Sequence, residues 1–370
     1  MIEKNRLLGL EVIRFLAACG VLFVHYHHFC HIDPWKADYG IPSYPFFHSV
    51  PFLYSLGGMW AVQIFWCLSG FIFFWKYQSL IADRKVDFKA FFVSRFARLY
   101  PLHILTLPIV AIGQSVFFHM TGSFYLKSLN SLPLFIGQLF MACNRTFMPE
   151  SFNFPTWSVE VEVIVYLIFF IVTRYVMTSI RFNLFIILLF IMTTLFKLQG
   201  SHTTSLLQCL LFFYSGGMAS ILRKYSVLHK FPCGLVWIAA GLIPLIFWFA
   251  GGFSTDDTIF LFLSIWTPIL MYCASGDLKV NALMRKTIEI LGNMTYSSYL
   301  IHIPVQLLIA IICYHWSIRL PVFNPLFFTA YLSLILFLSY FIYRYFELPM
   351  KEIIKERISG RVGSKPWEMQ

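Results

Sequence analysis

The sequence predicts an all-α membrane protein, a polytopic bundle of about ten transmembrane helices. Hydrophobic residues make up 59% of the chain and charged residues only 12%, which leaves few charges to cover a water-soluble domain of 370 residues. Apolar runs of about 20 residues, the length that crosses the hydrocarbon core of a bilayer, recur along the chain. Lysines and arginines gather at alternate ends of these runs, as expected for a chain that crosses a membrane repeatedly.

The apolar runs define the expected spans in order. They cover residues 10–30, 58–75, 99–119, 158–173, 182–198, 205–222, 234–250, 258–275, 288–313 and 325–346, with a weaker apolar stretch at 132–143. No second soluble domain is predicted between them. We therefore expect residues 1–346 to form one integral membrane domain and residues 347–370 to form a short basic cytoplasmic tail.

The basic residues predict that both termini lie in the cytoplasm. The basic clusters lie at residues 4–6, 84–98, 174–181, 223–230, 279–286 and 351–365. The positive-inside rule assigns these segments to the cytoplasmic side, and an even number of spans returns the chain to that side. This topology, together with contact with anionic membrane lipids, explains the net charge of +11, so we expect no nucleic-acid partner.

The first expected span carries ionisable residues along one stripe. Arg14 and His25 are eleven positions apart, so they return to nearly the same side of a helix, roughly 16 Å apart along its axis. Glu11 and His28 extend the stripe. Because ionisable groups within a span usually face a bundle interior or a wet cavity, the stripe predicts a functional site. The alternative is that Arg14 reaches the cytoplasmic interface and His25 is a hydrogen-bonded structural residue.

The ninth expected span carries a second polar stripe. Thr295, Tyr299, His302 and Gln306 follow one another at helical spacing along an otherwise apolar run. Such a stripe either lines a site or hydrogen-bonds a neighbouring helix, and both interpretations stay open.

The fourth expected span contains two glutamates that cannot face the same cavity. Glu160 and Glu162 lie about 200° apart around a helix, and Tyr166 follows Glu162 on its own face. We therefore expect Glu162 to face the interior and to lie either near a cation such as His25 or Arg14 or in water, because an unpaired buried carboxylate tends to take up a proton. The alternative is that Glu162 is an interfacial carboxylate near the outer side.

Two arginines precede the third expected span. Arg95 and Arg98 are three positions apart, just ahead of Pro101, so their guanidinium groups share one side of a helix. Two guanidinium groups at the cytoplasmic surface suit a ligand that carries phosphates. Ordinary anchoring of a basic segment at the membrane explains them equally well.

Other kinds of site are less well supported. The histidines at positions 25, 27, 28 and 31 do not complete a set of three or four ligands with supporting groups, so we expect no metal. The chain has no glycine-rich phosphate loop and no nucleophile elbow. The outer connections 31–57 and 120–156 are rich in aromatic residues, which suit either a carbohydrate surface or an interfacial aromatic belt.

Six motifs, in order, give the chain its resemblance to a known family. They are Glu11, Arg14 and His25; Leu68, Ser69, Gly70 and Phe71; Arg95, Arg98, Tyr100 and Pro101; Trp157, Ser158 and Glu162; Tyr296, Tyr299 and His302; and Glu347, Leu348 and Pro349. In these features the chain resembles the acyltransferase 3 family of bacterial integral membrane proteins. It departs from the family pattern at Glu160 and Val163, where a Ser and a second Glu are usual, and at Thr295, which replaces a Ser.

The resemblance implies an O-acyltransferase of the bacterial inner (cytoplasmic) membrane. Its donor would be a cytoplasmic acyl-CoA, usually acetyl-CoA, and its acceptor a hydroxyl of an extracytoplasmic or lipid-linked carbohydrate such as O-antigen, exopolysaccharide or capsule. Arg14, Arg95 and Arg98 would hold the donor. His25 would act as general base or transient acyl carrier, and Glu162 would orient it. Arg14, Tyr299 or His302 would stabilise developing negative charge or position the acceptor. The residues expected to bind the acceptor are Trp157, Tyr166, Tyr299 and His302.

Two other classes of protein stay open. A carrier or flippase for a polar lipid-linked substrate would also place histidine, arginine and glutamate within its spans. It would move its substrate without changing it chemically. A non-catalytic membrane scaffold or sensor would tolerate replacement of His25 and Glu162.

Overall fold

The computed structural model describes residues 7–31, 60–126, 129–145, 148–149, 152–176, 179–196, 204–225, 242–244, 246 and 256–359. Within these residues the regular elements are helical and no strand occurs, which confirms the predicted all-α class. The α-helices are α1 (Leu8–His25), α4 (Ala61–Lys76), α5 (Gln78–Ala82), α6 (Phe88–Thr121), α7 (Leu132–Leu139), α8 (Trp157–Tyr175), α9 (Ile180–Leu195), α10 (Thr204–Tyr225), α12 (Asp256–Ala274), α13 (Ala282–Asn293), α14 (Thr295–His315), α15 (Pro325–Ile342) and α16 (Leu348–Ser359). Shorter segments are the 3-10 helices η1 (Tyr26–His31) and η3 (Phe154–Thr156) and the π-helical η5 (Tyr343–Glu347).

Six helical stretches of the described chain are long and apolar enough to cross a membrane. They are Leu8–Cys30, Phe88–Thr121, Phe154–Tyr175, Ser205–Tyr225, Thr295–His315 and Pro325–Ile358, and shorter apolar helices cover Ala61–Lys76, Ile180–Thr193 and Thr258–Ala274. The expected span 234–250 lies almost wholly outside the described residues. The multi-pass membrane character is confirmed, while the number of spans and the side on which the termini lie stay predictions.

Large apolar side chains point outward from several of these helices. Ile112 of α6, Phe185 of α9 and Phe337 of α15 are 66%, 61% and 60% exposed. In water such faces would drive aggregation, whereas in a bilayer they contact lipid tails. The outer surface of the helix bundle therefore fits a hydrocarbon environment.

The helix α6 begins earlier than the expected third span and carries the basic residues within it. The Asp87 side chain accepts a 2.7 Å hydrogen bond from the Ala90 backbone N–H and caps the first turn. With 34 residues α6 is roughly 51 Å long, which exceeds the thickness of the hydrocarbon core. Arg95 and Arg98 therefore project from a helix and not from a flexible connection.

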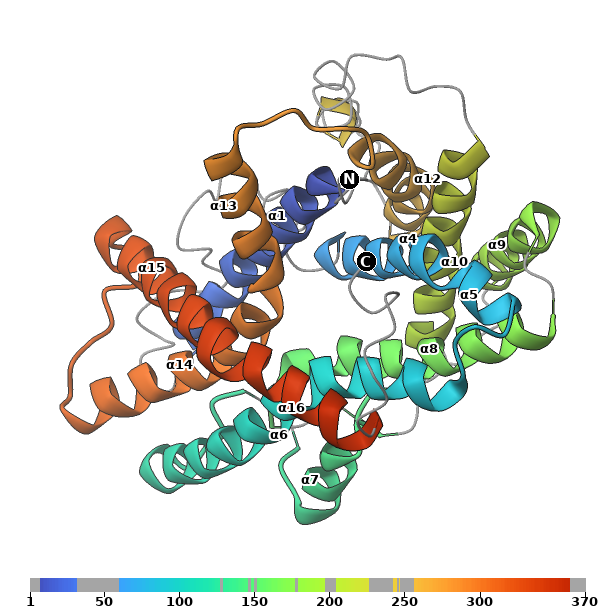
Figure 1. Ribbon diagram of the computed structural model, residues 1–370. Coiled ribbons are helices and arrows are strands. Elements are labelled where there is room, and N and C mark those ends of the chain that lie inside the picture. The colour runs from blue at the N-terminus through green and yellow to red at the C-terminus, as the bar shows by residue number, and fades with distance from the viewer. Residues whose placement is uncertain are drawn as a thin grey trace.

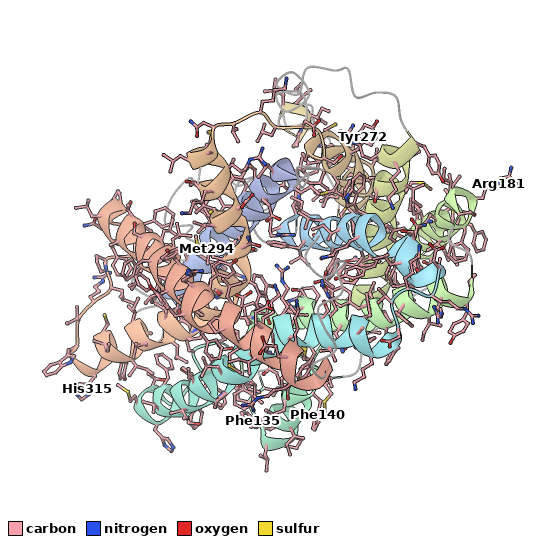
Figure 2. All side chains as sticks on the ribbon, viewed as in Figure 1. Phe135, Phe140, Arg181, Tyr272, Met294 and His315 are labelled. Carbon is pink, nitrogen blue, oxygen red and sulfur yellow. The ribbon has the colours of Figure 1, made fainter. Side chains whose placement is uncertain are left out.

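The expected ninth span, 288–313, is two helices and not one. The chain turns at Met294, between α13 and α14 (Figure 2). Gly292 and Asn293, just before the turn, are poor helix formers. The helix α13 buries only Gly292, whereas α14 buries Thr295 and the polar residues that follow it on the stripe. The break separates a mostly exposed amphipathic helix from the helix that crosses the bundle.

The helices α4 and α10 cross at direct backbone contact. A Cβ added at Gly70 would overlap the backbone carbonyl of Phe213, and one added at Gly216 would overlap that of Cys67. Small residues permit such close approach in membrane bundles, where packing and not water exclusion holds helices together. In Figure 1, α10 lies beside α4, α12 and α9, while α1 lies beside α13.

The buried apolar residues form two clusters, and α14 runs from one to the other. The first cluster is centred on α4, α8 and α10 and includes Tyr299 of α14. The second lies among η1, α6, α14 and α15 and includes Ile303, one turn further along. His302 lies between these two residues in sequence and is fully buried. The polar stripe of α14 thus lies at the boundary between the two apolar regions.

Candidate active site

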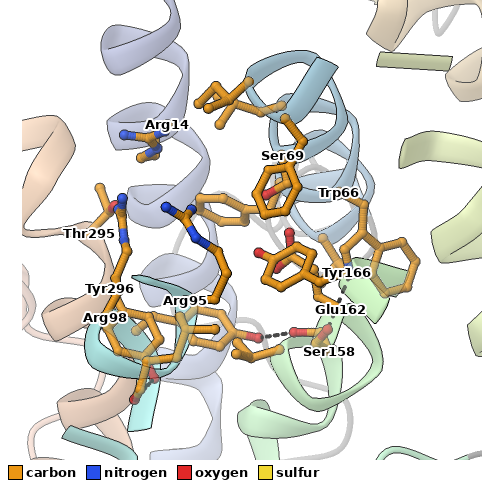
Figure 3. Close-up of a pocket in the computed structure, with 18 residues that line it drawn as sticks. Arg14, Trp66, Ser69, Arg95, Arg98, Ser158, Glu162, Tyr166, Thr295 and Tyr296 are labelled. Atoms are coloured by element: carbon orange, nitrogen blue, oxygen red, sulfur yellow. Dashed lines mark hydrogen bonds between the residues drawn. The ribbon is translucent and has the colours of Figure 1, made fainter. Parts of the chain in front are cut away.

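A cavity of roughly 870 Å³, counting the part open to solvent, lies between α1, α4, α6, α8 and α14. Its polar lining residues are Arg14, Ser69, Arg95, Arg98, Ser158, Glu162, Tyr166, Thr295, Tyr296 and Tyr299. The three arginine side chains gather on one side of it, and Ser158, Glu162 and Tyr166 lie on the other (Figure 3). We call it the arginine cavity.

Arg14 projects into the arginine cavity from the second turn of α1 and is only 8% exposed. Its guanidinium group forms an ion pair with Glu11, one turn earlier, with N and O 2.5 Å apart. Glu11 lies against Gly292 of α13, where an added Cβ would overlap its carboxylate. Arg98 is close enough for its charge to oppose that of Arg14. This end of the cavity is therefore cationic, with Glu11 as a partner for Arg14.

Arg95 and Arg98 line the cavity from the first third of α6. Arg95 donates hydrogen bonds to the hydroxyls of Tyr77, at 2.8 Å, and Ser94, at 3.0 Å. Its guanidinium carbon lies 5.2 Å from the ring centroids of both Phe73 and Tyr77, so aromatic faces hold the side chain in position. Arg98 interacts at longer range with the buried carboxylate of Glu347. The two arginines present preorganised donors of the kind that bind phosphate oxygens.

The two glutamates of α8 lie in different surroundings, as their spacing predicts. Glu160 Oε1 accepts hydrogen bonds from the Thr156 hydroxyl, at 2.8 Å, and from the Gln138 amide, at 3.4 Å. Glu162 lines the arginine cavity beside Ser69 and Tyr166. Glu162 Oε1 is buried without a hydrogen-bond partner, although the side chain is 8% exposed overall. Glu162 therefore offers a free acceptor to whatever occupies the cavity.

Tyr299 connects the arginine cavity with the histidines. Its hydroxyl lines the cavity, lies 2.8 Å from the Ser158 hydroxyl and donates to the Pro155 carbonyl at 2.7 Å. The Tyr299 and His302 ring centroids are 6.0 Å apart, and the His302 and His25 ring centroids are 4.9 Å apart in a stacked arrangement. A continuous row of polar rings thus leads from the cavity to the end of α1.

The hydrogen bonds of His25 and His302, which we call the histidine pair, define their tautomers. His302 Nδ1 lies 3.2 Å from the Ser298 carbonyl oxygen, which can only accept, so Nδ1 carries the hydrogen. In the neutral ring His302 Nε2 is then an acceptor, and it lies 2.7 Å from His25 Nδ1. His25 Nδ1 therefore donates, which leaves the lone pair on His25 Nε2. That is the protonation state a general base requires.

Helix α14 also fixes the backbone at His25. The Gln306 amide donates a 2.9 Å hydrogen bond to the His25 carbonyl oxygen, at the point where α1 passes into η1. His302 is fully buried, whereas His25 is only partly buried. His25 is thus held at both its ring and its backbone, although the residue as a whole is not fully buried.

The structure brings most of the sequence-predicted residues together but changes one of the expected contacts. Glu162 was expected to orient His25; instead, His302 hydrogen-bonds that ring, and Glu162 lies in the arginine cavity, which His25 does not line. The reason is depth, because three helical turns separate Arg14 from His25 along α1. Trp157 does not line the cavity either: it packs against Trp66, with ring centroids 5.9 Å apart, and beneath Arg145.

Two residues had no role assigned from the sequence: Ser69, which lines the arginine cavity, and Tyr77, which lies outside it but contacts Arg95. Ser69 was part of a motif, yet its placement beside Glu162 depends on how α4 packs against α8. Tyr77, which holds Arg95, follows the end of α4 and has no periodic signal of its own. In the described part of the chain, no three His, Cys, Asp or Glu side chains are grouped so that they could hold a metal. The expectation that no metal is needed stays a prediction.

Comparison with known proteins identifies the domain. Residues 7–344 match the family model of the acyltransferase 3 family, whose description is an acyltransferase domain. The chain belongs to the acyltransferase 3 family. Comparisons with curated proteins and with solved structures gave no match. The protein is therefore a multi-pass membrane acyltransferase, and the finer identity of its donor and acceptor has to be argued from the site.

Glu347, three residues beyond the part of the chain that matches the family model, lies near the arginine cavity. Glu347 ends the π-helical segment η5, is 5% exposed, and accepts a 2.7 Å hydrogen bond from the Ser297 hydroxyl of α14. Its charge acts on that of Arg98. Each of the three cavity arginines thus has a carboxylate close enough to interact with its charge: Glu11 for Arg14, Glu347 for Arg98, and Glu162 for both Arg95 and Arg98.

Proposed function

We propose that this membrane acyltransferase transfers an acetyl group from acetyl-CoA to a hydroxyl of an extracytoplasmic or lipid-linked polysaccharide, in the bacterial inner membrane. The observation that carries the proposal is the His25 ring, whose hydrogen bond to His302 leaves Nε2 as a base at the end of a polar path from the arginine cavity. A base connected by a polar path to a cationic cavity suits a reaction between a hydroxyl and an anionic thioester donor.

The arginine cavity supports the choice of donor. Coenzyme A carries phosphates at one end and the thioester at the other, joined by the slender pantetheine arm. Arg14, Arg95 and Arg98 would bind the phosphates, and the arm would extend past Glu162 toward Tyr299. The free Oε1 of Glu162 would accept a hydrogen bond from an amide N–H of the arm. The positive-inside rule predicts that this arginine end faces the cytoplasm, where coenzyme A is made.

The chemistry is a direct acyl transfer in our proposal. The acceptor oxygen bonds to the acetyl carbon, the carbon–sulfur bond breaks, and the hydroxyl proton passes to His25 Nε2 and then to the departing thiolate. His302 stabilises the imidazolium that forms on His25 by accepting from Nδ1–H. Carbohydrate as the acceptor class, with O-antigen, exopolysaccharide and capsule as the candidates, rests on the family resemblance and on the aromatic outer connections.

The first test is mass spectrometry of surface and lipid-linked glycans. Cells would carry the intact protein, a His25→Ala variant at equal membrane abundance, or neither. We expect a base-labile 42-Da acetyl increment only with the intact protein. An increment that survives His25→Ala would overturn the mechanism, and glycans that move across the membrane without any increment would indicate a carrier.

A further inference from the structure

A second cavity adjoins the arginine cavity and is more cationic. It measures roughly 730 Å³ with the part open to solvent, and Arg95 and Arg98 line both cavities. Its other cationic lining residues are Lys76, Lys351 and Lys355, and we call it the lysine pocket. No carboxylate is among its lining residues. The two cavities therefore meet at the arginine pair of α6.

Three separate elements contribute the charges of the lysine pocket. Lys76 ends α4, the arginines belong to α6, and Lys351 and Lys355 lie one turn apart on α16. Like charges one turn apart destabilise a helix in isolation. Glu352 forms ion pairs with both lysines, at 3.8 Å with Lys351 and 3.9 Å with Lys355, and its side chain is 60% exposed. Such long, exposed contacts contribute little, so most of the positive charge is left for a ligand.

Tyr77, which also lines the lysine pocket, is affected by the same concentration of positive charge. Burial raises the pKa of the Tyr77 phenol, but the nearby charges of Arg95, Lys76 and Lys355 outweigh burial and lower that pKa below its ordinary value. The hydroxyl of Tyr77 accepts a 2.8 Å hydrogen bond from Arg95, which is one of the two arginines that line both cavities. Positive anchoring at a membrane surface does not require cations to converge on a concave site.

We propose that the lysine pocket binds the ribose 3′-phosphate of coenzyme A, with Lys351 and Lys355 of α16 as its principal contacts. The inference rests on the proposed donor. A phosphate monoester carries close to two negative charges at neutral pH and suits lysine ammonium groups, which bind phosphate as point charges. The donor's diphosphate then lies at Arg95 and Arg98, between the two cavities. An anionic lipid headgroup offers the same chemistry, but it would not need the shared wall with the arginine cavity.

The test compares two donors that differ only in this phosphate. Binding of acetyl-CoA and of acetyl-dephospho-CoA is measured by calorimetry on the full-length protein in lipid nanodiscs. We expect the unaltered protein to bind acetyl-CoA at least about tenfold more tightly. The double variant Lys351→Gln/Lys355→Gln should lose this preference but bind acetyl-dephospho-CoA as tightly as the unaltered protein does. The double variant Lys351→Arg/Lys355→Arg, which keeps both positive charges, should retain the preference for acetyl-CoA. The matched control is Lys279→Gln/Lys286→Gln, which removes two exposed lysines outside both cavities.

Each remaining outcome overturns a different statement. Equal affinity of the unaltered protein for the two donors overturns the assignment of the 3′-phosphate and leaves the acyltransferase proposal intact. A preference that survives in the double variant means that the phosphate binds elsewhere. Binding of neither donor overturns coenzyme A as the donor. Retention of phosphatidylglycerol by the unaltered protein but not by the double variant, with no preference between donors, assigns the lysine pocket to a lipid headgroup and overturns the inference.

Discussion

The arginine cavity is built from full charges, whereas the histidine pair, farther along the same two helices, is built from neutral hydrogen-bonding groups. In the cavity, Arg14 pairs with Glu11, and Glu162 keeps a free carboxylate oxygen. At the pair, His25 is held by His302 and by Gln306. Charged side chains attract a charged ligand over a distance and then bind it, whereas a neutral imidazole can accept a proton. The difference suggests that one region binds the donor and the other performs the transfer.

The largest effect is expected at the histidine pair. His25→Ala should lower kcat about 10²- to 10⁴-fold, the usual contribution of a general base, and leave acetyl-CoA affinity unchanged. The measurement is release of free thiol by the purified protein, with donor binding measured in parallel. His315→Ala, at the exposed far end of α14 (Figure 2), is the matched control. A parallel loss of donor affinity in His25→Ala would contradict the assignment of donor binding to the arginine cavity and of transfer to the histidine pair.

The next largest effect is expected from the partner of His25. His302→Leu should lower kcat about 10- to 100-fold with little change in KM for the donor, because His25 loses the acceptor that sets its tautomer. His302→Gln retains an acceptor oxygen and should restore part of the rate. Equal losses in the two variants, or a rise in KM alone, would assign His302 to binding or to folding.

The arginines should affect binding and not turnover. Arg95→Gln or Arg98→Gln should raise the KM for acetyl-CoA about tenfold or more and change kcat little, since each removes a charge-assisted contact. The effect should shrink as the salt concentration rises. Arg357→Gln, an exposed position on α16, is the control. A loss confined to kcat would place these arginines in the chemistry.

The smallest effect is expected at Glu162. Glu162→Gln should raise the donor KM only about two- to tenfold, because the amide oxygen still accepts and only the added strength of a charged acceptor is lost. Glu160→Gln should instead lower the thermal midpoint, since it disturbs the contacts with Thr156 and Gln138. If Glu162→Gln abolished transfer while donor binding stayed normal, the cavity would also take part in catalysis.

Properties that depend on one helix were predictable from the sequence, and contacts between helices were not. The divergence of Glu160 and Glu162 follows from helical geometry alone. The partner of His25 lies 277 positions away, so spacing within the first span carries no information about it. The break at Met294 follows the poor helix formers Gly292 and Asn293, and the length of the apolar run alone does not reveal it.

The lysine pocket is a further case of the same limit. Lys351 and Lys355 belong to a basic segment that the sequence predicts to be a cytoplasmic tail. In the structure, the helical path from α15 through η5 into α16 brings them to the same pocket as Arg95 and Arg98. In contrast, Arg95 and Arg98 were singled out from the sequence because they are adjacent on one helix. Sequence periodicity identifies groups that share a face, and tertiary packing decides what that face meets.

Because one uninterrupted helix carries both Arg14 and His25, their separation is fixed by the backbone hydrogen bonds of α1. In the proposed reaction α1 therefore fixes the distance between the site that binds the donor's phosphates and the base. A donor anchored by its phosphates near Arg14 has to extend its thioester roughly 16 Å along α1 to reach His25, whatever the size of the acyl group. Only the acyl group completes the passage toward the acceptor, so group transfer through the bundle needs no large rocking motion of the helices.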